Sequence, residues 1–351
     1  LLTGALAAAA CAIPGTFLLL RGMSLIGDAI SHAVLPGIVV AFLVTGKVTT
    51  WPVVLGAGAT GLGTVWLIES LRRTRRVKED ASIAVVFPAL FALGVLLIAR
   101  FAGQTDLDQE CVLYGEIAYA PLDRMVLGGV EVVRPAFVLG AVALLNLVLV
   151  SVLYKELELV TFDTAYAAAA GLSPVLVHYL LMGSVSVTTV ASFESVGAIL
   201  VVAFLIVPAA TAYLLTDRLW VMLLLAVAVG VVCATVGYRV AQKLDSSIAG
   251  CMAAALGAAF VLAWLLSPRT GILARLVRER RLRRRYESAL LVEHLARAPA
   301  PAGALARELH WPADRTAALV RRLRCRGLVT ERGELLHPTA AGLTFARTTV
   351  G

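Results

Sequence analysis

The chain contains 351 residues, of which 60% are hydrophobic and only 15% are charged. Soluble domains are about 45–50% apolar and about 25% charged, so this composition argues against a water-soluble enzyme and against a disordered chain. The net charge of +8 is unevenly distributed, because residues 268–351 hold 17 Arg and only 7 acidic residues. We therefore predict a nearly neutral membrane part followed by a basic tail.

Apolar blocks fill residues 1–267. A helix needs about 20 apolar residues to cross a bilayer. We count nine candidate spans, at about 2–20, 28–46, 51–70, 82–100, 135–154, 173–192, 195–215, 219–239 and 247–267. The predicted fold class is therefore an all-α polytopic membrane protein. The sequence begins with Leu and its first apolar run starts at once, so we expect the natural N-terminus to lie upstream.

The charged loops predict an orientation for these spans. Basic loops tend to stay in the cytoplasm, and the two most basic stretches are residues 72–78 and 275–285. Six predicted spans separate them, which places both on the same, inner side. The same count places the acidic loop 101–134 outside and residues 155–172 inside.

The tail has a different composition and is predicted to fold separately. Residues 268–285 form a basic juxtamembrane linker, helical through Arg285. Beyond it we predict three helices, two strands and a last short helix, at about 286–297, 302–309, 314–326, 327–330, 333–336 and from 339. This is the winged-helix order, in which the third helix reads DNA. Residues 286–351 are thus expected to form a small α+β winged-helix-like cytoplasmic domain.

A polar cluster opens the second predicted span, in the segment RGMSLIGDAISHAVLPG at 21–37. Asp28 and His32 are helical neighbours at i, i+4, with Ser31 beside them. Their oxygen and nitrogen atoms suit Mn²⁺, Fe²⁺ or Zn²⁺, and Pro36 removes a hydrogen bond to the carbonyl of His32. The alternative is a polar helix cap, with Asp28 stabilised by the helix dipole. His178, at the start of another span, is a possible additional ligand.

Two other segments carry candidate functional residues. Glu194 lies at the outer mouth of its predicted span, where it would act as a gate or transient ligand, or only as a charged helix start. The inner segment FDTAYAAAAGL at 162–172 predicts an Ala-rich helix that is capped at one end and stopped by Gly171. Such a compact knob could dock into a partner, and a plain connector is the alternative.

Over residues 1–270 the chain resembles the permease subunits of metal-uptake ABC transporters, which import manganese, zinc or iron. The resemblance rests on six motifs in the family's order: RGMSLIGDAISHAVLPG, RRTRRVKEDASIAVVF, LYGEI at 113–117, FDTAYAAAAGL, SVGAILVVAFLIVPAATAYLL and SPRTGIL at 267–273. It implies a transmembrane metal permease domain over 1–267. The location would be the inner or plasma membrane of a bacterium.

The resemblance also implies partners and a site. Two permease chains, identical or related, would surround a central pathway, and an extracytoplasmic metal-binding protein would deliver the ion. The in-membrane metal site carries over onto Asp28 and His32, with the divalent metal as cargo and no permanently bound cofactor. A cytoplasmic ATPase would dock on the coupling helix, which carries over onto Asp163, Ala165, Ala168 and Gly171. The sequence contains no GxxxxGK[ST] phosphate loop, so we expect ATP hydrolysis by that partner and not by this chain.

The tail resembles the winged-helix module of iron-dependent metal repressors. Its predicted third helix offers cations for phosphate and guanine contacts, at Arg315, Arg321, Arg322 and Arg324. A structural or regulatory appendage is the alternative, with the Arg-rich stretch 275–285 anchored to the anionic inner leaflet. The alternative function is a membrane-tethered DNA-binding regulator that responds to metal. A proton-coupled transporter is a third hypothesis, but we find no inverted halves with broken helices.

Overall fold

The computed structural model describes residues 1–45, 50–74, 77–101, 117, 120, 122–127, 130–267, 271–332 and 335–350. The chain divides into two compact units, Leu1–Leu265 and Leu266–Gly351. The predicted motif LYGEI at 113–117 lies almost wholly outside the described residues, as do parts of RRTRRVKEDASIAVVF and SPRTGIL. The two units are described separately below.

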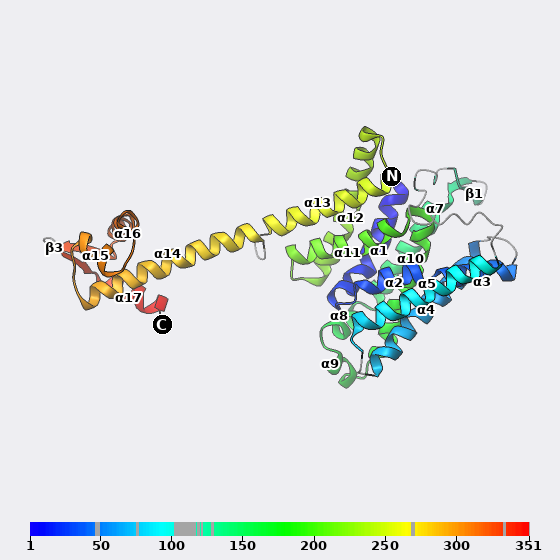
Figure 1. The fold of residues 1–351 in the computed structure, drawn as a ribbon, viewed down its shortest axis with the longest axis horizontal. Coiled ribbons are helices and arrows are strands. Elements are labelled where there is room, and N and C mark those ends of the chain that lie inside the picture. The colour runs from blue at the N-terminus through cyan, green and yellow to red at the C-terminus, as the bar shows by residue number, and fades with distance from the viewer. Residues whose placement is uncertain are drawn as a thin grey trace. The chain divides into compact units, whose positions relative to one another are not determined.

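The first unit is built from helices and one small hairpin (Figure 1). Its helices are α1 (Leu2–Leu20), α2 (Leu25–Ala33), α3 (Leu35–Thr45), α4 (Thr50–Arg73), α5 (Glu79–Phe101), α7 (Arg134–Val152), α8 (Tyr154–Phe162), α9 (Thr164–Ala169), α10 (Pro174–Val196), α11 (Ala198–Leu215), α12 (Leu219–Leu244) and α13 (Ile248–Leu266). The strands β1 (Arg124–Leu127) and β2 (Val130–Val133) pair antiparallel. The acidic outer loop was not predicted to contain a hairpin.

Within the described residues, eight helical segments are long and apolar enough to cross a membrane. They coincide with eight of the nine predicted spans, and α2 and α3 together make one of them. The ninth prediction, 51–70, falls on the helix α4, but the side chains of residues 51–54 lie outside the described part of the chain, so this stretch is not among the eight. The helical fold, with eight candidate spans among the described residues, is therefore that of a polytopic membrane protein, and a crossing by α4 stays a prediction.

Small residues let the helices of the first unit approach closely. Helix α1 contacts α7, α10, α11 and α12, and a Cβ on Gly15 would overlap the backbone of Leu205 on α11. A Cβ on Gly37 of α3 would likewise overlap the carbonyl of Gly56 on α4. Close backbone contact replaces the hydrophobic driving force that is absent between helices in lipid.

The connections of the first unit gather at its two ends. Helices α8 and α9 lie at one end, with the turn between α4 and α5 (Figure 1). The N-terminus, β1 and the turn between α12 and α13 lie at the opposite end (Figure 1). The predicted orientation assigns the first group to the cytoplasm and the second to the outside, so each group shares one predicted side.

The second unit has its own hydrophobic core. Its elements are α14 (Ile272–Arg297), α15 (Ala302–Glu308), α16 (Ala313–Cys325), β3 (Val329–Arg332), β4 (Leu335–Pro338) and α17 (Ala340–Val350). Strands β3 and β4 pair antiparallel, and Ala300 forms an isolated bridge with Leu336. The core includes Leu291, Leu295, Leu305, Val320, Leu323 and Leu336.

The predicted linker 268–285 is not separate from the first predicted helix of the tail. Helix α14 runs without a break from Ile272 to Arg297, since no Gly or Pro interrupts it. Ion pairs at i, i+4 support it, with 3.0 Å between Arg275 Nε and Glu279 Oε1 and 3.1 Å between Arg283 Nε and Glu287 Oε1.

Candidate metal site

Asp28 and His32 lie on the same face of the nine-residue helix α2. His32 Nε2 is 3.6 Å from Asp28 Oδ1. Two ligand atoms that each lie about 2.1 Å from a tetrahedral ion are about 3.4 Å apart. The pair could therefore bind one divalent ion from this position with little movement. The dipole also favours Asp28, because it stands in the first turn of α2.

Two aromatic side chains of α5 hold the imidazole ring of His32. The ring centroid of Phe87 lies 5.4 Å from that of His32, and the centroid of Phe91 lies 6.2 Å away in an edge-on arrangement. These contacts wall one side of the ring with apolar surface and restrict its rotation. Sequence analysis missed both Phe residues, because only the packing of α2 against α5 brings them to His32.

The helix that carries the pair ends directly after it. Helix α2 stops at Ala33 and α3 begins at Leu35. Pro36 has no N–H to donate to the carbonyl of His32, which is the break that the sequence predicts. The amides of Gly37 and Ile38 both donate to the carbonyl of Val34 instead, at 3.0 and 3.2 Å.

The pair remains accessible from outside this chain. The side chain of Asp28 is 45% exposed and that of His32 is 27% exposed. The Ser31 hydroxyl donates to the carbonyl of Gly27 at 2.9 Å and is buried. No group of three His, Cys, Asp or Glu side chains that could hold a metal occurs within the described ranges. Among the described residues, the structure therefore brings together Asp28 and His32 but not His178.

Glu194 stands in the last turn of α10, which ends at Val196. Gly197 follows with φ +81° and caps the helix, and α11 starts directly at Ala198. The Glu194 side chain lies outside the described part of the chain, so its role as a gate stays a prediction.

The predicted coupling helix is α9, a short helix with an exposed surface. The Asp163 side chain accepts a hydrogen bond from the amide of Tyr166 at 2.8 Å, and Gly171 has φ +84°, as the predicted cap and stop require. Ala165, Ala168 and Gly171 are exposed, whereas Ala167 is buried. The face of α9 that points away from the first unit therefore carries small side chains and is accessible to a partner.

Acidic side chains pair with some of the candidate arginines of the tail. Arg315 pairs with Glu287 and Arg324 pairs with Glu331. Arg321 and Arg322 are exposed on α16. Two of the four candidate nucleic-acid contacts are thus engaged within the second unit itself.

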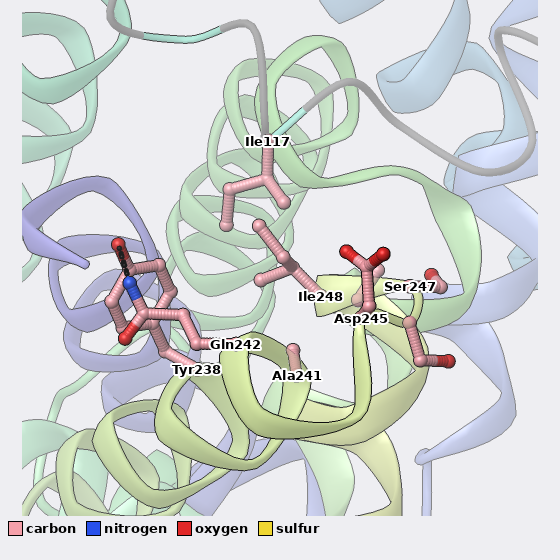
Figure 2. A pocket seen from close by; sticks show the side chains of 9 residues that line it. Ile117, Tyr238, Ala241, Gln242, Asp245, Ser247 and Ile248 are labelled. Carbon is pink, nitrogen blue, oxygen red and sulfur yellow. Dashed lines mark hydrogen bonds between the residues drawn. The ribbon is translucent and has the colours of Figure 1, made fainter.

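A cavity of about 480 Å³ lies at the end of the first unit that carries the N-terminus and β1 (Figure 2). Its middle is apolar, with Ile117 opposite Ile248 and with the carboxylate of Asp245 to one side. Gln242 Nε2 donates to the hydroxyl of Tyr238 at 3.0 Å, so these two polar groups satisfy each other. This hollow therefore offers a single carboxylate beside apolar walls, which is a poor metal site.

The long apolar helices define the class of this protein as a helical membrane protein. The chain belongs to the ABC 3 transport family, whose match covers residues 1–267.

Individual relatives extend this match. The chain is 48% identical over 277 residues to the manganese transport system membrane protein MntD of Bacillus subtilis, across 79% of this chain and 94% of that relative. It is 40% identical to the zinc transport system membrane protein TroD of Treponema pallidum, across 96% of this chain and 94% of that relative. The TroD match therefore includes most of the second unit.

A solved structure matches the first unit. The structure of PsaBC from Streptococcus pneumoniae in complex with Fab has a TM-score of 0.65 and 29% identity. The match covers 77% of this chain and 91% of that chain.

Proposed function

We propose that this chain is the membrane permease subunit of an ABC importer that moves a divalent transition metal, manganese, zinc or iron, into the cytoplasm. The observation that carries the proposal is the 3.6 Å Asp28–His32 pair on α2, inside the part of the chain that matches the family. The names of the two relatives, a manganese and a zinc transport system membrane protein, support the class of cargo.

The pair suits transport better than permanent binding. One carboxylate and one imidazole leave the coordination of a transition metal incomplete, so the ion is held weakly enough to be released. A second permease chain beside the half-exposed Asp28 would supply the remaining ligands. The similar solved structure is that of PsaBC, a name that denotes two components, which supports a permease pair.

Energy for transport would come from a separate ATPase that docks on α9. This helix exposes Ala165, Tyr166 (61% exposed) and Ala168, and Phe162 just before it is 65% exposed. An exposed apolar knob at the end of a membrane unit is suited to insertion into a groove of a cytoplasmic partner. An extracytoplasmic metal-binding protein would deliver the ion at the opposite end.

The tail is proposed to be a winged-helix-like cytoplasmic domain. Its order of three helices, a β-hairpin and a last helix supports this, and so does the isolated bridge that pairs Ala300 with Leu336 of the hairpin. DNA binding through Arg321 and Arg322 would be seen as protection of DNA by the full-length protein.

Elemental analysis of cells tests the transport function. Cells that lack the chain, and cells with the wild type, His32→Ala or Asp28→Ala restored, are grown in metal-poor medium and analysed for Mn, Fe and Zn. We expect one metal to fall without the chain, to return with the wild type, and to stay low with both variants. His337→Ala, a tail variant, is the control. Unchanged metal content in the cells that lack the chain would refute metal import.

A further inference from the structure

A second cavity, of about 360 Å³, lies at the end of the first unit that carries α9. Its walls come from the ends of α1, α4 and α8 and from the starts of α9 and α10. The polar and charged side chains that line it include Arg21, Glu69, Arg72, Arg73, Thr164 and His178. The cavity is thus lined both by the segment before α2 and by the start of α9, the proposed coupling helix.

The charge of this cavity is positive. Three Arg side chains and one carboxylate, that of Glu69, line it. Arg72 Nε lies 2.9 Å from Glu69 Oε2, and Arg73 Nε lies 3.4 Å from Glu69 Oε1. Both oxygens of the Glu69 carboxylate are therefore engaged by two arginines, so among the described residues of the lining the third arginine, Arg21, has no acidic partner.

Two of the side chains that line the cavity each have a nitrogen atom with unused hydrogen-bonding capacity. Arg21 Nε donates to Thr161 Oγ1 at 3.2 Å, but Arg21 Nη2 is buried and has no hydrogen-bond partner among the described residues. His178 Nε2 is also buried without such a partner. Burial lowers the pKa of the Arg21 guanidinium, which is the mark of a desolvated charge. A buried polar group left unpaired is costly, so both atoms require an explanation.

We propose that this cavity binds an oxyanion of the phosphate class, with Arg21 Nη2 and His178 Nε2 as donors. A guanidinium and an imidazole N–H are donors that suit phosphate oxygens, whereas the surplus of positive charge disfavours the transported metal cation. The anion comes either from free inorganic phosphate or from the phosphodiester of an anionic lipid. This site is additional to the proposed metal site and does not depend on transport.

Phosphate binding to the full-length protein tests the proposal. The chain is purified into phosphatidylcholine nanodiscs and titrated with inorganic phosphate, with thermal unfolding as the readout and chloride at equal ionic strength as the reference. We expect phosphate to stabilise the wild type, and Arg21→Gln to weaken the effect by about tenfold or more, because a charged donor is lost. Arg218→Gln removes an exposed Arg away from the cavity and should bind phosphate like the wild type.

A second pair of variants keeps the test valid if Arg21→Gln does not fold. His178→Gln retains an amide donor near the position of Nε2, whereas His178→Asn is too short to reach it. Phosphate stabilisation should survive in the Gln variant and be lost in the Asn variant.

Nanodiscs with phosphatidylglycerol distinguish the two sources of the anion. Stabilisation by this lipid without added phosphate, lost in Arg21→Gln, identifies a lipid headgroup. Stabilisation by phosphate in phosphatidylcholine alone identifies the free anion. The proposal is overturned if neither stabilises the protein, or if the effect is equal in Arg21→Gln, His178→Asn and wild type.

Discussion

Asn146 of α7 donates through Nδ2 to the carbonyl of Ala10 on α1, at 2.9 Å. The same amide nitrogen donates to Thr188 Oγ1 at 2.7 Å, and its oxygen accepts from Ser184 Oγ at 2.8 Å, both on α10. One buried side chain thus connects three spanning helices through hydrogen bonds that water cannot replace.

The hydrogen bonds of Asn146 should contribute measurably to the stability of the first unit. Asn146→Ala should lower the free energy of unfolding by about 1–2 kcal/mol, because interhelical hydrogen bonds in membrane proteins contribute on that scale. Unfolding of the purified protein in detergent measures it. Thr235→Val is the control, since the Thr235 hydroxyl donates only within its own helix, to Val231. Equal losses in the two variants would contradict a special role for Asn146.

Of two glycines on α4, Gly56 lies at the close contact with α3 and Gly58 does not, so substitutions at the two positions test that contact. A Cβ on Gly56 would lie 2.5 Å from the carbonyl oxygen of Gly37 and 3.0 Å from the Cβ of Ala41. A Cβ on Gly58 would meet nothing within 4 Å. Gly56→Ala should therefore lower the melting temperature through overpacking that costs about 1–3 kcal/mol. Gly58→Ala should leave it unchanged or raise it, as Ala favours the helix.

The sequence predicts structural features that depend on neighbouring residues, but it does not predict contacts between residues far apart in the chain. Span positions follow from the thickness of the bilayer, and the Asp28–His32 pair follows from helical spacing alone, so both were predictable. The cap by Asp163 is equally local. The contact of Arg21 with Thr161 joins residues 140 positions apart, and only tertiary packing produces it.

One missed element did have a signal in the sequence. Gly128 and Gly129 separate two short runs rich in Val, which is a pattern typical of a two-residue hairpin. The strands β1 and β2 pair around that point, with Leu127 opposite Val130. In the tail, helix α14 extended past its predicted start because nothing in the Arg-rich stretch breaks a helix.

Phe87 is predicted to position His32 for the metal. Phe87→Ala should remove the wall beside the imidazole ring and lower metal uptake several-fold, because a ring that rotates freely binds the ion less well. Uptake of radioactive Mn²⁺ or Zn²⁺ into cells, normalised to the amount of protein in the membrane, measures the effect. Phe101→Ala, at the exposed end of the same helix, should take up metal like the wild type.

Asp163 caps α9 and also carries a negative charge, and two variants distinguish these roles. Asp163→Ala removes the hydrogen bond from the Tyr166 amide. Loss of such a cap lowers helix stability by about 0.5–2 kcal/mol, which is enough to unfold a helix of only six residues. We expect uptake to fall while the protein still reaches the membrane. Asp163→Asn keeps a capping oxygen and should retain most of the uptake. If Asn were as harmful as Ala, the charge of Asp163 would matter and the cap would not.

Removal of the tail tests whether transport needs it. Every residue of the core around Leu291 and Leu336 comes from the second unit, so its deletion leaves the core of the first unit complete. The cut belongs after Ser267, because a cut at 286 would divide α14 in the middle of the helix. We expect the shortened chain to reach the membrane and to keep at least about half of the metal uptake, since the family match also ends at 267. A stable shortened chain without uptake would show instead that the tail takes part in transport, and a chain that fails to accumulate would make it part of assembly.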